Sequence, residues 1–537
     1  MDTAALSSSQ DYLLLLFPAA TTFLSPILTI LLVAASLVWL FPGGPAWALS
    51  GLVRRLRAGA APPIPLPPGA PGVVTAAVAG PAAHRSLAAL SRSVPGGDAL
   101  VSFTVGLTRF VVASRPDTAR ELLSGAAFAD RPVKGAAREL LFHRAMGFAP
   151  SGDYWRALRR VSSAHLFSPR SVACSAPRRL AIGDRMVEHL LLSAHNGGRG
   201  GEGEEVAMRR VLHAASLDHV MATVFGARYD ADCREGAELE AMVKEGYDLL
   251  GLFNWADHLP LLGWLDLQGV RRRCRSLVAR VNVFVGKIIQ EHRQKRTINC
   301  GGDESAAGDF VDVLLGLEGE EKLSESDMIA VLWEMIFRGT DTVAILLEWV
   351  MARMVLHPDI QAKAQAELDA VVGRGPGNRA VSDADVARLP YLQRIVKETL
   401  RVHPPGPLLS WARLAVHDAS VGGHAVPAGT TAMVNMWAIA RDPAVWPEPN
   451  TFRPERFEED EDVSVLGGDL RLAPFGAGRR VCPGKTLALA TAHLWLAQLL
   501  HRFEWAPAAG GGVDLSERLN MSLEMEKPLV CKARPRW

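Results

Sequence analysis

A glycine-rich loop around one cysteine constrains this chain more than any other stretch. Residues 474–484 read PFGAGRRVCPG, and an apolar helix pattern follows from Lys485 to about Phe503. Neighbouring positive charge and backbone N–H groups lower the pKa of a thiol, and the resulting thiolate is a metal ligand. Glycines let a backbone come close to a large flat partner. The loop therefore predicts an iron–thiolate site at Cys482.

Length, composition and cysteine spacing exclude several classes of protein. The chain has 537 residues, of which 49% are hydrophobic and 21% are charged, and its net charge is +1. This length suffices for one very large domain. The chain lacks the excess of basic residues that would indicate nucleic acid as a partner. The six cysteines form no C-x-x-C pair, so we expect the five outside the loop to be free thiols in a reducing compartment.

The N-terminal region predicts a membrane anchor. Residues 12–53 carry no charge, and residues 23–41 form an apolar run long enough to span a bilayer. Three arginines follow by residue 57, so we expect residues 1–22 in the lumen and the remaining chain in the cytosol. A cleaved signal peptide is the alternative, because Ala46-Trp47-Ala48 offers a cleavage-like site. The acidic start and the length of the apolar run favour the anchor.

Behind the anchor, the sequence predicts a basic flank and proline-rich hinge over residues 42–72 and one globular catalytic domain over residues 73–537. The hinge contains PPIPLPPGAPG, which cannot be helical and should be extended. Trp39 and Trp47 are expected at the membrane interface. Helix patterns dominate the domain, so its fold class is mainly α with a smaller β portion.

Several of these helices have readable ends. A capping-box pattern at Ser324 opens an apolar pattern that runs about 30 residues to His357, whereas helices average ~12 residues. Further helices are predicted over residues 358–372 and 382–402. Short strands are predicted over residues 412–436, where Pro and Gly punctuate alternating patterns.

The cysteine loop is similar to a known signature. Phe475, Gly478, Arg480, Cys482 and Gly484 match the haem-binding motif of the cytochrome P450 family. The resemblance implies the fold of that family behind an N-terminal transmembrane helix, with haem b held by the Cys482 thiolate as axial ligand. It further implies a microsomal plant-type enzyme of the endoplasmic reticulum membrane. The stretches Phe337–Ala344 and Trp411–Leu414 resemble the KLUH and plastochron-type proteins that regulate plant growth.

A second motif is an E-x-x-R pair. Glu398 and Arg401 share a helix face, and charges in an apolar helix are tolerated only when paired. The segment Phe452–Phe457 resembles the family's P-E-R-F segment, which implies that Arg456 joins the pair in a buried structural triad that holds the cysteine loop. An ordinary surface ion pair is the alternative.

A third motif, Gly339-Thr340-Asp341-Thr342, lies within the long helix and resembles the family's oxygen-activation motif. The resemblance implies two catalytic residues: Thr342 would donate to bound oxygen, and Asp341 would relay protons from solvent. Gly339 would let the helix open beside the oxygen. The alternative, a capping pair at a helix end, fits poorly because the apolar pattern continues beyond Leu346.

Four residues are expected at the haem propionates. Trp155 and Arg159 lie one helical turn apart and resemble the family's propionate-binding pair. Arg413 and Arg480 are the other propionate partners that the resemblance implies. A surface stack of Trp155 and Arg159 is the alternative reading of that pair.

Arg338 departs from the family pattern, which has a small residue at this position. It lies four residues before Thr342 and close to the same helix face. Glu334 lies four residues earlier and could pair with it. The other hypothesis is that Arg338 binds an acidic or oxygenated substrate.

The resemblance implies a monooxygenase that inserts one atom of O2 into a C–H bond of a lipophilic small molecule, with a fatty acid as one candidate. The sequence shows no NADPH or flavin fingerprint, so electrons from NADPH are expected through a membrane-bound NADPH–cytochrome P450 reductase. Two alternatives stay open: an isomerase or dehydratase of the same fold that uses no O2, and a catalytically silent haem sensor.

Overall fold

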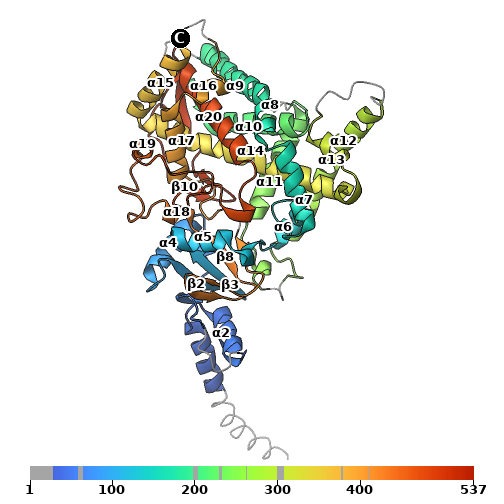
Figure 1. Cartoon of the computed structure of the whole chain (residues 1–537), viewed down its shortest axis with the longest axis vertical. Coiled ribbons are helices and arrows are strands. Elements are labelled where there is room, and N and C mark those ends of the chain that lie inside the picture. Colours follow the sequence, from blue (N-terminus) through green and yellow to red (C-terminus); the bar gives the residue numbers. More distant parts are fainter. Residues whose placement is uncertain are drawn as a thin grey trace, which may run out of the picture.

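The computed structural model describes residues 28–57, 64–197, 204–228, 233–259, 261, 263–298, 308–375, 379–409 and 412–537. Helices fill most of the molecule, and a small sheet region lies beside them, with α2 beyond the sheet (Figure 1). This arrangement confirms the prediction of a mainly α fold with a smaller β portion.

The larger helices of the domain are α4 (Ala83–Ser93), α5 (Pro116–Ser124), α7 (Asp153–His165), α9 (Ala176–Gly197), α10 (Met208–Val224), α11 (Arg234–Gly251), α12 (Val270–Ile298), α14 (Glu325–Leu356), α15 (Pro358–Val372), α17 (Pro390–Val402) and α20 (Lys485–Arg502). Shorter ones are α2 (Pro45–Arg57), α3 (Ala76–Ala79), α6 (Gly135–Glu139), α8 (Pro169–Cys174), α13 (Phe310–Leu315), α16 (Asp383–Val386), α18 (Met436–Ile439) and α19 (Arg456–Glu459).

The largest sheet has the strand order β1-β2-β3-β8-β5. Its strands are β1 (Gly69–Val73), β2 (Leu100–Val105), β3 (Thr108–Ala113), β8 (Thr431–Val434) and β5 (Arg413–Leu414). A second sheet joins β4 (Glu204–Ala207), β12 (Val530–Pro535) and β9 (Phe503–Pro507), and two pairs join β6 (Ala419–Val421) to β7 (His424–Val426) and β10 (Glu517–Leu519) to β11 (Leu523–Met525). The strands between residues 412 and 436 are where the sequence predicts them.

Helix α14 is the central element of the fold. Ser324 caps it by accepting from the N–H of Asp327, as the capping-box pattern predicts. Its N-terminal half packs into one hydrophobic cluster with α10, α11 and α12, and its C-terminal half packs into another with α10, α17 and α20. Because both clusters converge on α14, it is buried over nearly its whole length.

The prediction of one helix over residues 382–402 is wrong. The structure has two helices there, α16 and α17, separated by a turn that ends at Pro390. Proline lacks a backbone N–H and its ring disfavours a helical conformation at the preceding residue. Leu389 accordingly has φ −115° and ψ 64°, and Pro390 opens α17.

The anchor is not established by the described part of the chain. Within it, no single helix is both long and apolar enough to cross a membrane. The helices Leu28–Leu40 and Pro45–Leu56 meet that test only together, and they are bent by 97°. The anchor over residues 23–41 therefore stays a prediction, and residues 1–27 lie outside the described residues.

The segment after this bend packs against the domain. Trp47 is fully buried, and its indole N–H donates to the carbonyl of Phe103 in β2 at 3.0 Å. Its predicted place at a membrane interface is therefore wrong, because α2 lies on the sheet. The sheet also takes in residues 69–72, which the sequence assigns to the hinge, since β1 pairs with β2.

Candidate active site

The cysteine loop is held in shape by glycines and by its own backbone. The N–H of Cys482 donates to the carbonyl of Phe475 at 3.0 Å. Gly476 and Gly478 have φ +71° and +67°, a conformation that only glycine adopts without strain. At Gly478 an added Cβ would also lie 2.1 Å from the carbonyl oxygen of Leu123. The conformation and the close approach both require glycine at this position.

We expect the Gly478→Ala variant to be strongly destabilised. The positive φ costs roughly 1–2 kcal/mol for a residue with a Cβ, and the contact with Leu123 forces the backbone to shift. Haem content per chain after purification, with the unfolding midpoint, checks this. Gly511→Ala is the control, because nothing lies within 4 Å of an added Cβ there. Equal haem content in the two variants would contradict the tight packing of the loop.

The Cys482 side chain is partly exposed because it faces a large cavity. Desolvation raises the pKa of its thiol, while Arg338, the backbone N–H of Gly484, Arg159 and Lys485 act to lower it. The surrounding positive charge therefore does not by itself produce a thiolate. A bound metal ion deprotonates a coordinating thiol outright. A metal bound at Cys482 would therefore complete the deprotonation that the nearby positive charges favour.

Five arginines line the same cavity: Arg338 of α14, which is described below, and Arg131, Arg159, Arg413 and Arg480. Arg159 donates to the carbonyl of Val481 at 2.9 Å, and Arg413 to that of Ala477 at 3.2 Å. Burial, with the charges of Arg480 and Arg159, lowers the pKa of Arg413 to about 9. Sequence reasoning did not single out Arg131, since a lone arginine in a loop gives no signal.

Trp155 lines the same cavity as these arginines. Its indole N–H donates to the carbonyl of Met146 at 3.1 Å, so this donor serves the backbone. The ring lies beneath the guanidinium of Arg480, 4.2 Å from its centroid. Arg480 in turn donates to the carbonyls of Ala129 and Ala149. In this arrangement Trp155 positions an arginine through its ring face.

Helix α14 supplies another wall of the cavity, which includes Arg338, Gly339 and Thr342. Thr342 is exposed into this space. Gly339 is needed for packing, because an added Cβ would lie 2.6 Å from Val220 of α10. It is Thr340 whose hydroxyl back-bonds along the helix, donating to the carbonyl of Ile336 at 2.7 Å.

Arg338 lies beside the buried carboxyl of Glu334, with 3.7 Å between Nη1 and Oε1. The same oxygen accepts from the N–H of Gly147 at 2.8 Å. Desolvation raises the pKa of Glu334, and the charge of Arg338 is the largest opposing effect. The Arg338 side chain remains 36% exposed, so its guanidinium is accessible from the cavity as well as paired.

Asp341 points away from the cavity. Its carboxyl lies 3.4 Å from Nε2 of His213 on α10 and is nearly buried. Desolvation, with the charge of Glu524, raises its pKa from 3.8 to about 7. The carboxyl can therefore hold a proton near neutral pH, as a relay requires.

Glu398, Arg401 and Arg456 form a buried charged cluster. Glu398 accepts from Arg401 at 2.7 Å and from Arg456 at 3.0 Å, and all three side chains are at most 4% exposed. The spare arginine N–H groups donate to the carbonyls of Ala440, Pro447, Glu448, Pro449 and Thr451. The cluster also accepts from the N–H of Arg453 at 3.0 Å, so it holds the backbone of residues 440–453, which precede the cysteine loop in the chain.

These surroundings fit haem. The cavity has about 1770 Å³ of empty space, counting its mouth, and Phe475, Gly484, Met335 and Val343 contribute to its largely apolar lining. The thiol of Cys482 on one wall matches the iron. The arginines, of which Arg413 and Arg480 are buried, match the two propionate carboxylates. Burying so many cations is costly unless anions accompany them.

Comparison with known proteins gives the class. A model of the cytochrome P450 family matches residues 77–533, and the chain belongs to this family. It is a cytochrome P450 monooxygenase, and the family and fold imply a haem–thiolate cofactor.

Particular relatives are plant proteins. The chain is 55% identical to cytochrome P450 78A5 of Arabidopsis thaliana, with 94% of both chains covered. It is 53% identical to cytochrome P450 78A1 of Zea mays, covering 92% of this chain and 90% of the relative. It is 35% identical to flavonoid 3'-monooxygenase of Arabidopsis thaliana, covering 84% and 88%.

The fold matches a solved structure, a zebra fish cytochrome P450 with abiraterone. The TM-score is 0.69 at 26% identity, covering 84% of this chain and 99% of the other. These matches confirm the family, and the likeness to cytochromes P450 78A agrees with the predicted subfamily.

Proposed function

We propose that this enzyme hydroxylates a C–H bond of a lipophilic small molecule, with a fatty acid as the leading substrate class. Electrons come from NADPH through a membrane-bound NADPH–cytochrome P450 reductase. The observation that carries the proposal is that Cys482 and Thr342 open into one largely apolar cavity whose polar groups include Arg338. The likeness to the KLUH and plastochron-type proteins extends the proposal to growth regulation in a plant.

The haem, when bound through Cys482, supplies the oxygen-activating chemistry. Arg131, Arg159, Arg413 and Arg480 would hold its propionates. The apolar lining excludes water, which would otherwise compete for protons. Thr342 Oγ1 can donate a hydrogen bond into the cavity from the wall that α14 supplies. The Asp341 carboxyl holds a proton. That proton reaches the cavity through solvent or when the Asp341 side chain turns.

The test is reductase- and NADPH-dependent oxygen consumption by the full chain, measured together with hydroxylated product. Consumption coupled to product supports the monooxygenase. Peroxide rearrangement that needs neither NADPH nor reductase would indicate the isomerase or dehydratase, and haem without any turnover would indicate the sensor.

Asp341 gives a prediction about pH. Its pKa is about 7 in the folded chain and near 3.8 when unfolded. A raised pKa means that the folded state keeps a proton that the unfolded state releases, so this group costs stability as pH rises from about 4 to about 7. We expect the stability gain of Asp341→Asn over wild type to be small near pH 4 and to rise to about 4 kcal/mol near pH 7.

Unfolding of wild type and Asp341→Asn at several pH values checks this. Asp341→Asn should also consume oxygen with less product, because the amide cannot release a proton. Asp514→Asn is the control, since Asp514 pairs with Lys527 at the surface. A pH-independent difference between wild type and the Asp341 variant would contradict the raised pKa.

Arg338 gives a prediction about the substrate class. If its guanidinium binds a carboxylate, Arg338→Ala should raise KM for a fatty acid about tenfold or more, since hydrogen bonds to charged groups contribute about 1.5–3 kcal/mol. KM for the matching fatty alcohol should change little. Arg338→Lys keeps the charge and should retain part of the preference. Equal KM changes for acid and alcohol would show that Arg338 serves only Glu334.

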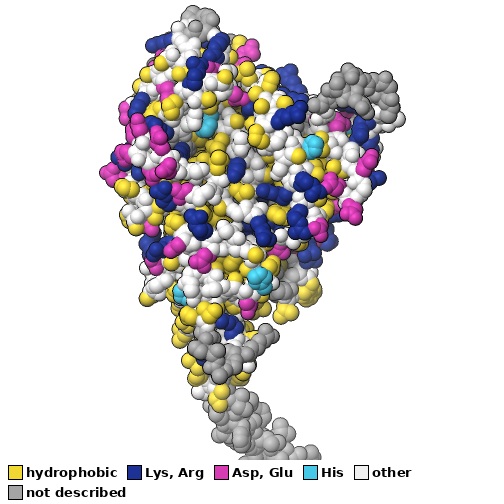
Figure 2. Space-filling model, viewed as in Figure 1, with side chains coloured by type: hydrophobic (Ala, Val, Ile, Leu, Met, Phe, Trp, Pro, Cys, Tyr) yellow, Lys and Arg dark blue, Asp and Glu magenta, His cyan; other side chains and the backbone are white. Residues whose placement is uncertain are grey.

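We also propose attachment to the endoplasmic reticulum membrane, with the catalytic domain in the cytosol. The helix Leu28–Leu40 supports this, because most of its large apolar side chains are exposed. Figure 2 shows yellow side chains at the narrow end of the molecule, where this helix and α2 lie. Fractionation of the full chain against a form lacking residues 1–41 tests it, and an unchanged membrane fraction would contradict it.

A further inference from the structure

A second cavity lies away from the haem site. Its walls come from the ends of α14 and α17, from α18 and the turn after it, from α4 and from β10. It encloses about 640 Å³ of empty space, counting its mouth, and shares none of its described lining residues with the haem cavity. No step of the proposed reaction uses it.

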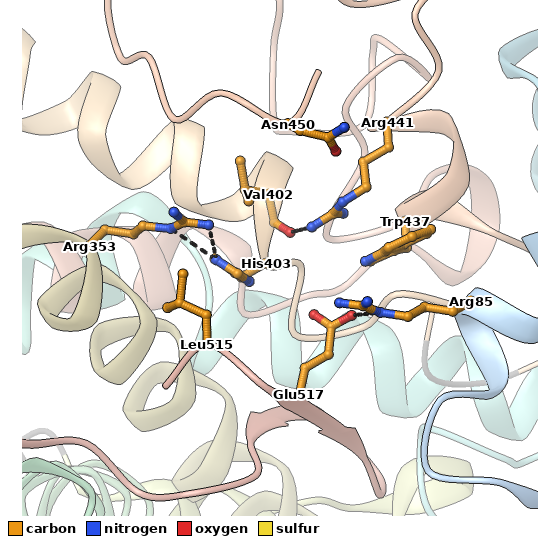
Figure 3. Close-up of a pocket in the computed structure, with 9 residues that line it drawn as sticks. All are labelled: Arg85, Arg353, Val402, His403, Trp437, Arg441, Asn450, Leu515 and Glu517. Atoms are coloured by element: carbon orange, nitrogen blue, oxygen red, sulfur yellow. Dashed lines mark hydrogen bonds and ion pairs between the residues drawn. The ribbon is translucent and has the colours of Figure 1, made fainter. Parts of the chain in front are cut away.

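The cavity gathers positive charge. Arg85, Arg353 and Arg441 reach into it from three different elements, and Glu517 is the one carboxylate among its described lining residues (Figure 3). Glu517 already accepts from Arg85 and from His84. With His403 neutral, the four charged side chains sum to +2. Burial lowers the pKa of Arg441 to about 9 and that of Arg353 to about 10.

The cavity also holds hydrogen-bond donors that have no acceptor. Arg353 donates through Nε and Nη2 to Nε2 of His403, at 3.1 and 2.8 Å. Nε2 is therefore the acceptor of this ring, so its proton sits on Nδ1. Nδ1 of His403, which is 3% exposed, has no partner, and neither do Nη1 of Arg441 and Nε1 of Trp437.

A buried hydrogen-bond donor without an acceptor costs about 1–3 kcal/mol of stability. All three atoms are covered in this structure, and their side chains line the cavity, so a small turn of the guanidinium or ring would bring them to a ligand oxygen there. Trp437 also lies between two of the arginines, with Arg441 4.2 Å and Arg85 5.3 Å from its ring centroid. The stacking keeps both guanidinium groups beside the cavity.

We propose that this cavity is a binding site for a phosphate group. Arginine is the side chain suited to phosphate, because its planar fork of N–H groups matches the phosphate oxygens. Guanidinium groups from three separate elements can surround a tetrahedral anion, each through the N–H groups that it does not already use. The charge of +2 matches a phosphate group, which carries about −1.5 to −2 at pH 7. The bound group would join α4, α14, α17 and α18.

The experiment uses the haem-loaded full chain in detergent, titrated with inorganic phosphate by calorimetry, with the unfolding midpoint as a second readout. Wild type should show saturable binding and a raised midpoint, because a ligand that binds only the folded state stabilises it. Arg85→Gln should weaken binding about tenfold or more, since it removes one charged donor. Arg85 is half exposed, so this variant should fold.

Trp437→Phe is a second variant, because it removes the N–H donor and keeps an aromatic ring. It too should weaken binding. Arg92→Gln is the matched control, since Arg92 is an exposed arginine on the same helix, α4, and it should bind phosphate as wild type does.

The same chemistry could come from free phosphate or from the phosphate of a lipid headgroup, so glycerol 3-phosphate is titrated in parallel. Tighter binding of the ester identifies a headgroup-like source, and tighter binding of inorganic phosphate identifies the free anion. The proposal fails if neither probe saturates. It also fails if Arg92→Gln loses as much affinity as Arg85→Gln.

Discussion

Replacing Glu398 by alanine is expected to lower the free energy of unfolding by about 3–5 kcal/mol. Glu398 is the only partner carboxylate that the structure describes for Arg401 and Arg456, and all three side chains are buried. Removing it leaves two guanidinium groups without a counter-charge in a low-dielectric interior, which is far costlier than losing an exposed pair. The loss should also release residues 440–451, which the two arginines hold.

The measurement is denaturant unfolding of the haem-loaded full chain, with haem release followed in parallel. Glu458→Ala is the matched control, because Glu458 pairs with Arg394 at the surface at 3.0 Å and is 60% exposed. Its removal should cost less than about 1 kcal/mol. If both glutamates cost the same, the buried cluster does not stabilise the chain as we describe.

Replacing Cys482 by serine is expected to reduce reductase-dependent turnover at least about a hundredfold, since even the partners of metal ligands typically contribute 10–100-fold. A hydroxyl does not replace a thiolate as an axial ligand, while the small change in shape should leave the loop folded.

Turnover and haem content of Cys482→Ser check this result against Cys174→Ser, which alters an exposed cysteine and should behave as wild type. Near-normal turnover of Cys482→Ser would overturn the assignment of the ligand.

The features that sequence could predict are those encoded locally. The loop around Cys482 carries its glycines and arginines within eleven residues. Helix α14 has a cap at its start and an unbroken apolar pattern, and it begins and ends where that pattern does. Glu398 and Arg401 were predictable as a pair because a spacing of three residues places two side chains on the same face of a helix.

The features that sequence could not predict depend on contacts between distant segments. Trp47 is buried because α2 lies on β2, 56 residues further along the chain. Arg131 and the phosphate-site arginines gain meaning only when several elements converge. The break at Pro390 is different, since proline does signal it and the apolar periodicity concealed it.

The most direct test of the central claim is the absorption spectrum of the purified full chain, reduced and exposed to carbon monoxide. Cys482 as the axial ligand predicts a Soret band at the wavelength that gives the cytochrome P450 family its name. A Soret band where histidine-ligated haem absorbs, in freshly prepared and fully folded protein, would contradict the assignment of Cys482 and the mechanism built on it.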